Sequence, residues 1–385
     1  MFDVIVVGVG GMGSASLYHL ARRGLKVLGI ERFGIPHDRG SSHGVNRIIR
    51  LAYLEHPSYV PLLRRAYELW RDLERDAGEP LLFITGSLDI GAPGSQTFDG
   101  SQLSCRLHDL EHEILAAADL RRRFPGYAIP DGLQAVYQPD GGFVLAERSV
   151  ERHVEGAVAR GAAVRTGEQV LDLDLTGDPV TVRTDRGVYH APRVVVTAGP
   201  WAGALVPSVA ALARPERQVL MWTAILQPER FTPAAFPVFN LEAPEGRFYG
   251  FPEFGVPGFK IGKYHHRLEA ADPDRVERGV DSRDEEVLRD ALGRYFPAAN
   301  GRRLSATTCL FTNSPDEHFI LDLLSGDPRV TVAAGFSGHG FKFCSVIGEI
   351  VADLATRGRT THDISLFRLS RYFPGKITGS ASSVV

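Results

Sequence analysis

The first forty residues hold two short apolar runs, and each run predicts a buried strand. Asp3 to Val7 and Leu25 to Ile30 are rich in β-branched residues without polar alternation, which is typical of strands covered on both faces. Between them, Met12 to Arg23 has apolar residues at helical spacing, and Gly24 is placed to end the helix. The order strand, helix, strand predicts a parallel βαβ unit.

Glycines occupy the turn between the first strand and the helix. Gly8, Gly10 and Gly13 form the pattern GxGxxG, and Gly11 lies among them. Glycine lets the backbone turn tightly and approach a pyrophosphate, which the N–H groups and positive dipole of the helix N-terminus attract. Glu31 ends the second strand, where its carboxylate can accept from ribose hydroxyls and would repel the additional phosphate of NADP. A glycine turn without a ligand would not require this acid, so we expect a site for NAD or FAD.

The totals describe an ordinary enzyme with a sizeable core. The chain has 385 residues, a formal net charge of −3 and 44% hydrophobic residues, which suggests two domains or one domain with a large insertion. This charge balance gives no reason to expect nucleic acid or a membrane surface as a partner. The three cysteines (Cys105, Cys309 and Cys344) form neither a disulfide framework nor a metal-binding pattern. With a strand directly after Met1 and no SKL-type signal in the tail SASSVV, we expect a cytoplasmic protein.

A basic stretch with the sequence HDRGSSHGVNRIIR follows the nucleotide-binding unit. It contains Arg39, Arg47 and Arg50 among small residues that include Ser41 and Ser42. Guanidinium groups bind carboxylate or phosphate through two parallel hydrogen bonds, and small residues allow a ligand to approach closely. Because the stretch leaves the carboxyl edge of the predicted sheet, a ligand-binding role is favoured over a solvated loop.

The middle of the chain combines helical and strand patterns. We expect helices over 58–77, 107–123 and 147–160, strands over 80–91 and 164–173, and a loop over 92–103. Val170 lies inside the second of these strand regions. The segment 193–201 reads as a buried strand that runs into a turn with Gly199 and Trp201. This turn is either a second approach to the nucleotide or a simple tight turn.

The composition changes near residue 215, where aromatic and β-branched runs are separated by Pro and Gly. The runs over 218–226, 237–241, 247–251, 259–265 and 306–311 predict an antiparallel sheet. Ser282 and Glu285 match a capping box before a helix over 287–295. Near the end, a strand over 330–334, a glycine turn and a helix over 345–354 repeat the character of the opening unit.

These patterns predict an α/β protein with a Rossmann-like nucleotide-binding domain built from both ends of the chain. An α+β substrate domain with an antiparallel sheet is inserted into it. We expect 1–83, 143–217 and 316–385 in the nucleotide-binding domain, and 84–142 and 218–315 in the substrate domain.

Several long strings resemble one family, the monomeric sarcosine oxidase and N-methyltryptophan oxidase family of flavoprotein amine oxidases. They are VGVGGMG, HDRGSSHG with RIIR, YGFPEFG, the segment with Cys309 and PDEHFI, and GFSGHGFKF. The resemblance spans essentially the whole chain and implies FAD rather than NAD. It also implies a covalent bond between Cys309 and the flavin, oxidation of a secondary amino acid to an imine that hydrolyses, reduction of O2 to H2O2, and a monomer.

The resemblance also assigns roles to particular residues. Arg50 and Lys342 would hold the substrate carboxylate, Arg47 would lie by the flavin, and Lys260 would assist oxygen reduction. Tyr249 and His339 would border the substrate, and among Tyr264, His265 and His266 we favour His265 as the side chain that faces it. The expected contacts of the cofactor are Gly8, Gly10, Gly11, Gly13, Glu31, Arg32, Arg39, Ser41, Ser42, Val170, Gly199, Trp201, Cys309, Gly338, Gly340 and Lys342.

Phe311 departs from the family pattern, which has tyrosine two residues after the cysteine. Loss of the hydroxyl favours a more apolar pocket, so a bulkier N-methyl amino acid or a cyclic imino acid such as proline or pipecolate is an alternative substrate. A dehydrogenase with another electron acceptor and a dinucleotide-binding protein without activity are further alternatives. The first does not require Lys260, and the second requires neither Cys309 nor the pair of Arg50 and Lys342.

Overall fold

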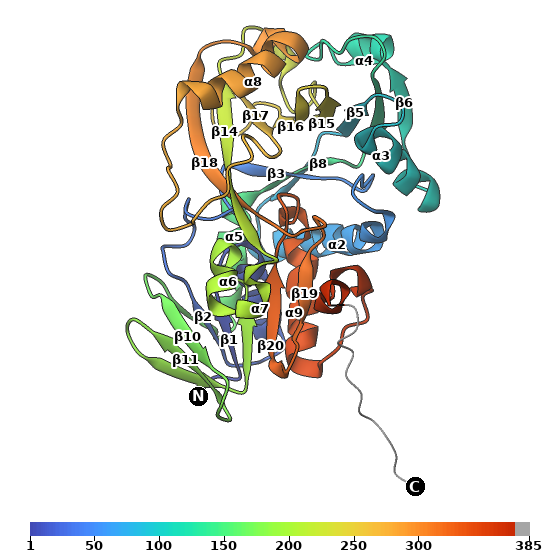
Figure 1. Cartoon of the computed structure of the whole chain (residues 1–385). Helices are drawn as coiled ribbons and strands as arrows, with labels where there is room; N and C mark the ends of the chain where they lie inside the picture. The colour runs from blue at the N-terminus through green and yellow to red at the C-terminus, as the bar shows by residue number, and fades with distance from the viewer. Residues whose placement is uncertain (374–385) are drawn as a thin grey trace.

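The computed structural model of the protein describes residues 1–373 and places its two largest sheets at opposite ends of the molecule (Figure 1). The tail SASSVV lies outside the described residues. Among the described residues, no helix has the length and apolar character needed to cross a membrane.

The six-stranded sheet contains the predicted βαβ unit. Its strands, in spatial order, are β19 (Ile320–Leu324), β20 (Asp327–Ala334), β13 (Arg193–Val196), β1 (Val4–Val7), β2 (Val27–Ile30) and β9 (Ala163–Arg165). All neighbours are parallel except β19 and β20. The side chains of β1 alternate between two cores, with Val4 and Val6 in one and Ile5 and Val7 in the other. This sheet is therefore buried on both faces, as its uninterrupted apolar runs predict.

Helices and a small sheet cover these two faces. On one side lie α1 (Gly11–Arg22), α2 (Val60–Ala77), α5 (Ala146–Val158) and α9 (Cys344–Arg357). On the other lie α6 (Ala202–Leu205), α7 (Pro207–Ala210) and the three-stranded sheet of β10 (Val170–Asp174), β11 (Val180–Thr184) and β12 (Val188–Ala191). Trp70 of α2 is fully buried in the first core.

The eight-stranded sheet forms the upper part of the molecule in Figure 1. Its order is β18 (Arg303–Asn313), β14 (Arg214–Thr223), β17 (Phe259–Lys263), β16 (Gly246–Phe251), β15 (Val238–Ala243), β5 (Ser87–Gly91), β7 (Gln134–Gln138) and β6 (Glu113–Ala116). One pair, β5 with β15, is parallel, so the sheet is mixed rather than fully antiparallel as expected. α4 (Ala117–Arg123) and α8 (Ser282–Tyr295) contribute to the core on one face.

A second three-stranded sheet, with β3 (Asn46–Ile49), β8 (Gly142–Leu145) and β4 (Leu82–Ile84), lies between the two large sheets (Figure 1). The strands of the six-stranded sheet fall within 1–83, 143–217 and 316–385, and those of the eight-stranded sheet fall within 84–142 and 218–315, except for the first four residues of β14, Arg214 to Arg217.

Several local predictions were wrong. The segment 92–103, predicted as a loop, contains most of α3 (Gln96–Leu107), where Ser95 caps the helix by accepting from the Phe98 N–H. Its Gly100 is needed for packing, because a Cβ there would lie 2.4 Å from the Leu54 carbonyl oxygen. The region 107–123, predicted as one helix, divides into β6 and the short α4.

Two further boundaries differ from the prediction. The single strand expected over 164–173 is two strands, β9 and β10, which belong to different sheets. The capping box of α8 is formed by Asp281 and Asp284 rather than by Ser282 and Glu285. Asp281 accepts from the Asp284 N–H and Asp284 accepts from the Asp281 N–H, so the same reciprocal geometry lies one residue earlier.

Candidate active site

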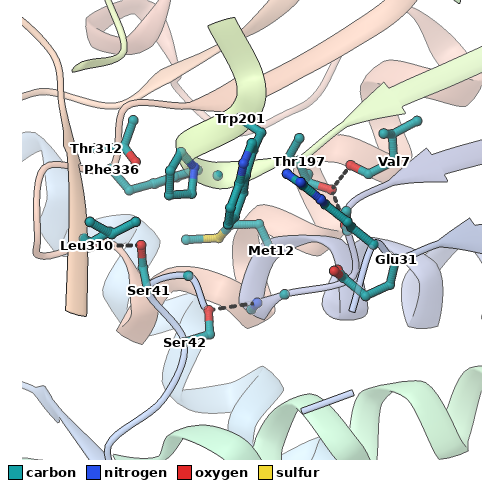
Figure 2. Close-up of a pocket in the computed structure, with 18 of the residues that line it drawn as sticks. Val7, Met12, Glu31, Ser41, Ser42, Thr197, Trp201, Leu310, Thr312 and Phe336 are labelled. Carbon is teal, nitrogen blue, oxygen red and sulfur yellow. Dashed lines mark hydrogen bonds between the residues drawn. The ribbon is translucent and has the colours of Figure 1, made fainter. Parts of the chain in front are cut away.

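A long cavity opens at the carboxyl ends of β1, β2, β13 and β20. Its walls include the residues that directly follow these strands, among them Gly8, Glu31, Thr197 and Gly335. Figure 2 shows side chains from the two ends and the middle of the chain around the same space. In open α/β sheets this edge is where ligands bind.

The glycines form a cradle with no room for side chains. A Cβ on Gly13 would lie 1.8 Å from the Gly8 carbonyl oxygen, and one on Gly8 would lie 2.8 Å from the Ala198 Cα. Gly8 also has a φ of +85°, which favours glycine. The N–H of Gly11, at the start of α1, donates to the Ser42 Oγ over 3.0 Å (Figure 2). The N-terminus of α1 therefore lies at the cavity wall beside Ser42, a position that suits a pyrophosphate.

Glu31 is fixed in the orientation that a ribose contact requires. Its carboxylate accepts from the N–H groups of Val9, over 2.8 Å, and Phe33, over 3.0 Å. Burial by itself would raise the pKa of Glu31, but His37 and these N–H groups lower it below its usual value. The side chain therefore remains an anionic acceptor at neutral pH, and the cradle and this acid together fit FAD.

Most of the other expected cofactor contacts also line the cavity. They are Gly10, Gly11, Arg32, Ser41, Ser42, Val170, Gly199, Trp201, Gly338 and Gly340. Four expected contacts do not line it: Gly13 packs against the Gly8 backbone, Arg39 is exposed, and Cys309 and Lys342 are buried behind the wall. His37, Thr197 and Phe336, which the sequence did not single out, add to the lining.

One face of the eight-stranded sheet carries several of the remaining candidate residues. Strand register places Lys260 between Phe251 and Trp222, and places Tyr249 next to Asn240, which in turn lies next to Asp89. Residues opposite each other in a sheet share a face, so these side chains form adjacent rows. Trp222, Tyr249, Phe251, Tyr264, Cys309 and Phe311 pack in one cluster there.

Lys260 is fully enclosed but hydrogen-bonded three times. Its Nζ donates to the carbonyl oxygens of Gly44 and Asn46, each over 2.7 Å, and to the Asn46 Oδ1 over 2.8 Å. Burial lowers the pKa of Lys260 well below its usual range. Three acceptors, however, need three donated protons, and only the ammonium form has three. The segment between Gly44 and Arg47 therefore holds a cation beside the cavity wall.

Cys309 lies beside Arg47, which itself lines the cavity. The Arg47 Nη2 is 3.9 Å from the Cys309 Sγ and 2.9 Å from the Ser41 carbonyl oxygen. Burial raises the pKa of the Cys309 thiol, and the Arg47 charge opposes this change by stabilising the thiolate. Leu310 and Phe311, the next two residues of β18, are cavity lining.

Arg50 is buried with two acidic partners. Its side chain is 1% exposed, and its Nε and Nη2 each lie 3.1 Å from a carboxylate, of Asp89 and Glu55 respectively. Burial alone would lower the pKa of Arg50, but the two acids raise it. Asp89 also accepts from the Ser101 hydroxyl and the Asn240 amide, which fixes its position. Two of the hydrogen-bonding nitrogens of the guanidinium are thus already engaged.

Lys342 and His339 lie in the glycine turn before α9. The Lys342 Nζ donates to the His339 carbonyl oxygen over 2.9 Å, and burial, with the nearby Arg50 charge, lowers the pKa of Lys342 to about 7. Burial also lowers the pKa of His339 to about 4, so its ring is neutral. Its Nε2 donates to the Glu317 carbonyl oxygen, which leaves Nδ1 to accept from the Tyr53 hydroxyl over 2.6 Å.

Among the three consecutive candidates, the structure brings Tyr264 to the site. Its ring packs 5.1 Å from that of Tyr249 and 5.8 Å from that of Phe311, measured between centroids. His265 instead lies between Glu216 and Glu317, which raise its pKa to about 9, and His266 lies by Asp284. β17 ends at Lys263, but its alternation continues so that Lys260 and Tyr264 share a face.

Sequence reasoning missed Asp89, Glu55, Tyr53 and Asn46. One signal was available for Asp89, which is a lone acid in the otherwise apolar strand SLDIG. No comparable signal marks Glu55 or Tyr53, because their roles depend on a tertiary contact with Arg50 or His339.

Comparison with known proteins agrees with this geometry. Residues 3–354 match the FAD dependent oxidoreductase family. Monomeric sarcosine oxidase of Bacillus sp. (strain NS-129) is 42% identical over 375 residues, which cover 96% of this chain and 97% of that protein. N-methyl-L-tryptophan oxidase of Salmonella enteritidis PT4 (strain P125109) is 35% identical over 373 residues, which cover 96% and 99%.

Solved structures share the fold along nearly the whole chain. NikD, an unusual amino acid oxidase of nikkomycin biosynthesis, has a TM-score of 0.82 at 29% identity, with 95% of this chain and 97% of that one covered. L-proline dehydrogenase from P. horikoshii has a TM-score of 0.83 at 20% identity, which supports the fold alone. The chain therefore belongs to the FAD-dependent oxidoreductase family, in the group that includes monomeric sarcosine oxidase and N-methyl-L-tryptophan oxidase.

Proposed function

We propose that the protein oxidises the C–N bond of a secondary amino acid, such as sarcosine or another N-methyl amino acid, to an imine that hydrolyses, while O2 is reduced to H2O2. The observation that carries this proposal is that Lys260, Cys309, Tyr249 and Phe311 share one face of the eight-stranded sheet, and that Phe311 on this face lines the dinucleotide cavity. The relatives named for oxidation of sarcosine and N-methyl-L-tryptophan support the substrate class.

FAD, when bound, would supply the acceptor for the hydride that leaves the substrate, and this hydride carries both electrons of the oxidation. Lys342 and the part of the Arg50 guanidinium that has no acidic partner would hold the substrate carboxylate. Both cations are buried, and electrostatic attraction is strong in a dry site. Tyr249, Phe311 and the neutral His339 would enclose the substrate and exclude water. Lys260 would place a positive charge where superoxide character develops during oxygen reduction.

We also propose that FAD is bound covalently through Cys309. The thiolate is the reactive form of cysteine, and Arg47 favours that form here. Within residues 1–373, no cation is in hydrogen-bond contact with Cys105 or Cys344, and burial raises the pKa of each thiol. The protein would act as a cytoplasmic monomer, in line with its three free cysteines and with its similarity to monomeric sarcosine oxidase.

The first experiment is acid precipitation of the purified protein, followed by absorption spectra of pellet and supernatant. Yellow colour in the pellet of wild type and of Cys105→Ala, and in the supernatant of Cys309→Ala, is the expected result. Colour in the supernatant of wild type would exclude the covalent bond. Peroxide release would then be measured with sarcosine, N-methyl-L-tryptophan, L-proline and L-pipecolate.

A cyclic imino acid or a bulky N-methyl amino acid is a second candidate substrate, since Phe311 brings no hydroxyl to the wall. A strong preference for sarcosine would exclude it. If substrate bleaches the flavin and no peroxide appears, the protein is a dehydrogenase with another acceptor.

A further inference from the structure

Arg247 is a cation of the site that makes no ion pair or side-chain hydrogen bond with residues 1–373. It lies on β16 two residues before Tyr249, so the two side chains share a face of the sheet. Its guanidinium stacks on the Tyr264 ring, 4.0 Å from the centroid. Glu242 is its cross-strand neighbour, but that carboxylate accepts from the Thr97 N–H instead.

Other polar groups near Arg247 also lack partners. The hydroxyls of Tyr249 and Tyr264 form no hydrogen bond within the described chain, although both residues are only 8% exposed. Polar groups of nearly enclosed residues are usually hydrogen-bonded in native proteins, so these two unpaired hydroxyl donors beside the Arg247 guanidinium indicate a ligand with acceptor atoms.

Arg50 and Arg247 differ in what they can still bind. Arg50 already contacts two carboxylates, and its side chain is 1% exposed. Arg247 is half-buried at the outer end of the same wall, and its planar guanidinium group has no hydrogen-bond partner within residues 1–373. A guanidinium fork matches a carboxylate through two parallel hydrogen bonds, and stacking on an aromatic ring fixes its plane.

We propose that Arg247 and Tyr264 form a subsite for a carboxylate on the substrate side chain, so that the substrate is a secondary amino acid with a second acidic group. This inference rests on the proposed function, because the α-carboxylate is assigned to Lys342 and Arg50. The subsite extends the site outward from Phe311, through Tyr264, to Arg247.

The test compares two substrates of the same shape, N-methyl-L-glutamate and N-methyl-L-glutamine. Wild type should prefer the glutamate derivative by about tenfold or more in kcat/KM, because only its carboxylate can form two charge-assisted hydrogen bonds with the guanidinium group. Arg247→Leu and Arg247→Gln should bring this ratio close to one, and Arg247→Lys should give an intermediate ratio. Arg302→Leu, an exposed arginine outside the site, should keep the wild-type ratio.

A ratio near one in wild type, or a ratio that Arg247→Leu leaves unchanged, would overturn the subsite. A second measurement does not depend on turnover. Glutarate binding, followed by the change in flavin absorbance, should weaken by about tenfold or more in Arg247→Gln, and an unchanged affinity would also overturn the proposal. Absence of turnover for every secondary amino acid, with glutarate bound as expected, would instead refute the proposed function.

Discussion

Three buried cations of the site have three different environments, and the difference decides what each can do. Arg50 has two carboxylate partners, Lys260 has three neutral acceptors, and Lys342 has one carbonyl oxygen. A cation with acidic partners is already neutralised, whereas one with few partners has unused binding capacity. Lys342 therefore has the greatest capacity for an incoming carboxylate, and its charge depends most on pH.

Binding of a simple carboxylate such as propionate should weaken as the pH rises above about 7. Burial lowers the pKa of Lys342 to about 7, so the amine is charged below this pH and becomes neutral above it. The dissociation constant, measured from flavin absorbance, should be flat below pH 7 and rise by up to about tenfold per pH unit above it. Lys342→Met should bind weakly with little pH dependence between pH 6 and 9. A flat wild-type profile over that range would contradict this assignment.

Lys260→Met should slow flavin reoxidation by O2 by about a hundredfold or more, since a preorganised charge at a developing anion has an effect of that size. Reduction by substrate under anaerobic conditions should change much less. Stopped-flow absorbance separates the two half-reactions. Lys263→Met, which changes a half-buried lysine on the same strand, is the matched control. Equal losses in both half-reactions would mean that Lys260 acts only by holding the segment from Gly44 to Arg47.

Sequence motifs indicate which residues are candidates for the site, but they do not indicate the direction in which each side chain points. The motif containing Lys260 identified three candidates after it, but only the continued alternation of β17 shows that Tyr264 faces Tyr249 and Phe311. Arg50 was found as a basic residue in a glycine-rich stretch, whereas its two acidic partners come from tertiary contacts. The type of each side chain is known from the sequence, whereas its neighbours depend on how distant segments pack together.

At the scale of elements, the entry to α1 depends on close backbone contact. Gly13→Ala should lower flavin content and the midpoint of thermal unfolding, because its Cβ would lie 1.8 Å from the Gly8 carbonyl oxygen, far below an acceptable 3.0 Å. Helix propensity favours alanine by only about 1 kcal/mol, whereas overpacking costs about 1–3 kcal/mol or more.

The matched control for this change is Gly34→Ala, where the nearest atom to the new Cβ is 3.9 Å away. That variant should keep wild-type flavin content and thermal stability. If Gly13→Ala also kept wild-type flavin content and thermal stability, then α1 could shift away from the turn that follows β1, and the glycine cradle would not be rigid.

Elements with a clear apolar period were predictable, and those fixed by tertiary contacts were not. The βαβ unit from Val4 to Ile30 and the final helix α9 follow from uninterrupted periodicity. α3 was missed because its glycine and serines are typical of loops, yet Gly100 allows the helix to lie against the Leu54 backbone. The parallel pair of β5 and β15 joins strands far apart in the chain, and no local pattern encodes that pairing.

At the scale of the molecule, ion pairs connect segments that are distant in sequence throughout the fold. Arg217 binds Asp284 between β14 and α8, Arg65 binds Glu349 between α2 and α9, and Arg371 binds Asp316 near the described end of the chain. Burial alone would raise the pKa of each of these carboxyls, but the pKa is lowered, mainly by His362 and Arg65 for Glu349 and mainly by hydrogen bonds with the arginine partner for Asp284 and Asp316. Such acids stabilise the folded chain only while they remain ionised.

The protein should therefore lose stability as the pH falls below about 4.5. Glu55 is an example, since Arg50 lowers its pKa to about 2 from a usual 4.5, against the effect of burial. The stabilisation by such a group is complete above the unfolded pKa and is lost as the pH falls towards the folded pKa, which for Glu55 is the range from about 4.5 to 2. Urea unfolding between pH 6 and pH 3 would measure this loss.

Glu55→Gln removes this titration and should reduce the fall in stability between pH 5 and pH 3, while it lowers stability at pH 6 because Arg50 keeps only Asp89. Glu286→Gln, at an exposed acid of α8, should leave the wild-type profile unchanged. If both variants lose stability as steeply as wild type below pH 5, then Glu55 is not strongly coupled to Arg50 in the folded protein. Arg50 would then be paired mainly with Asp89 through its Nε, and its Nη2 would be more available to the substrate α-carboxylate.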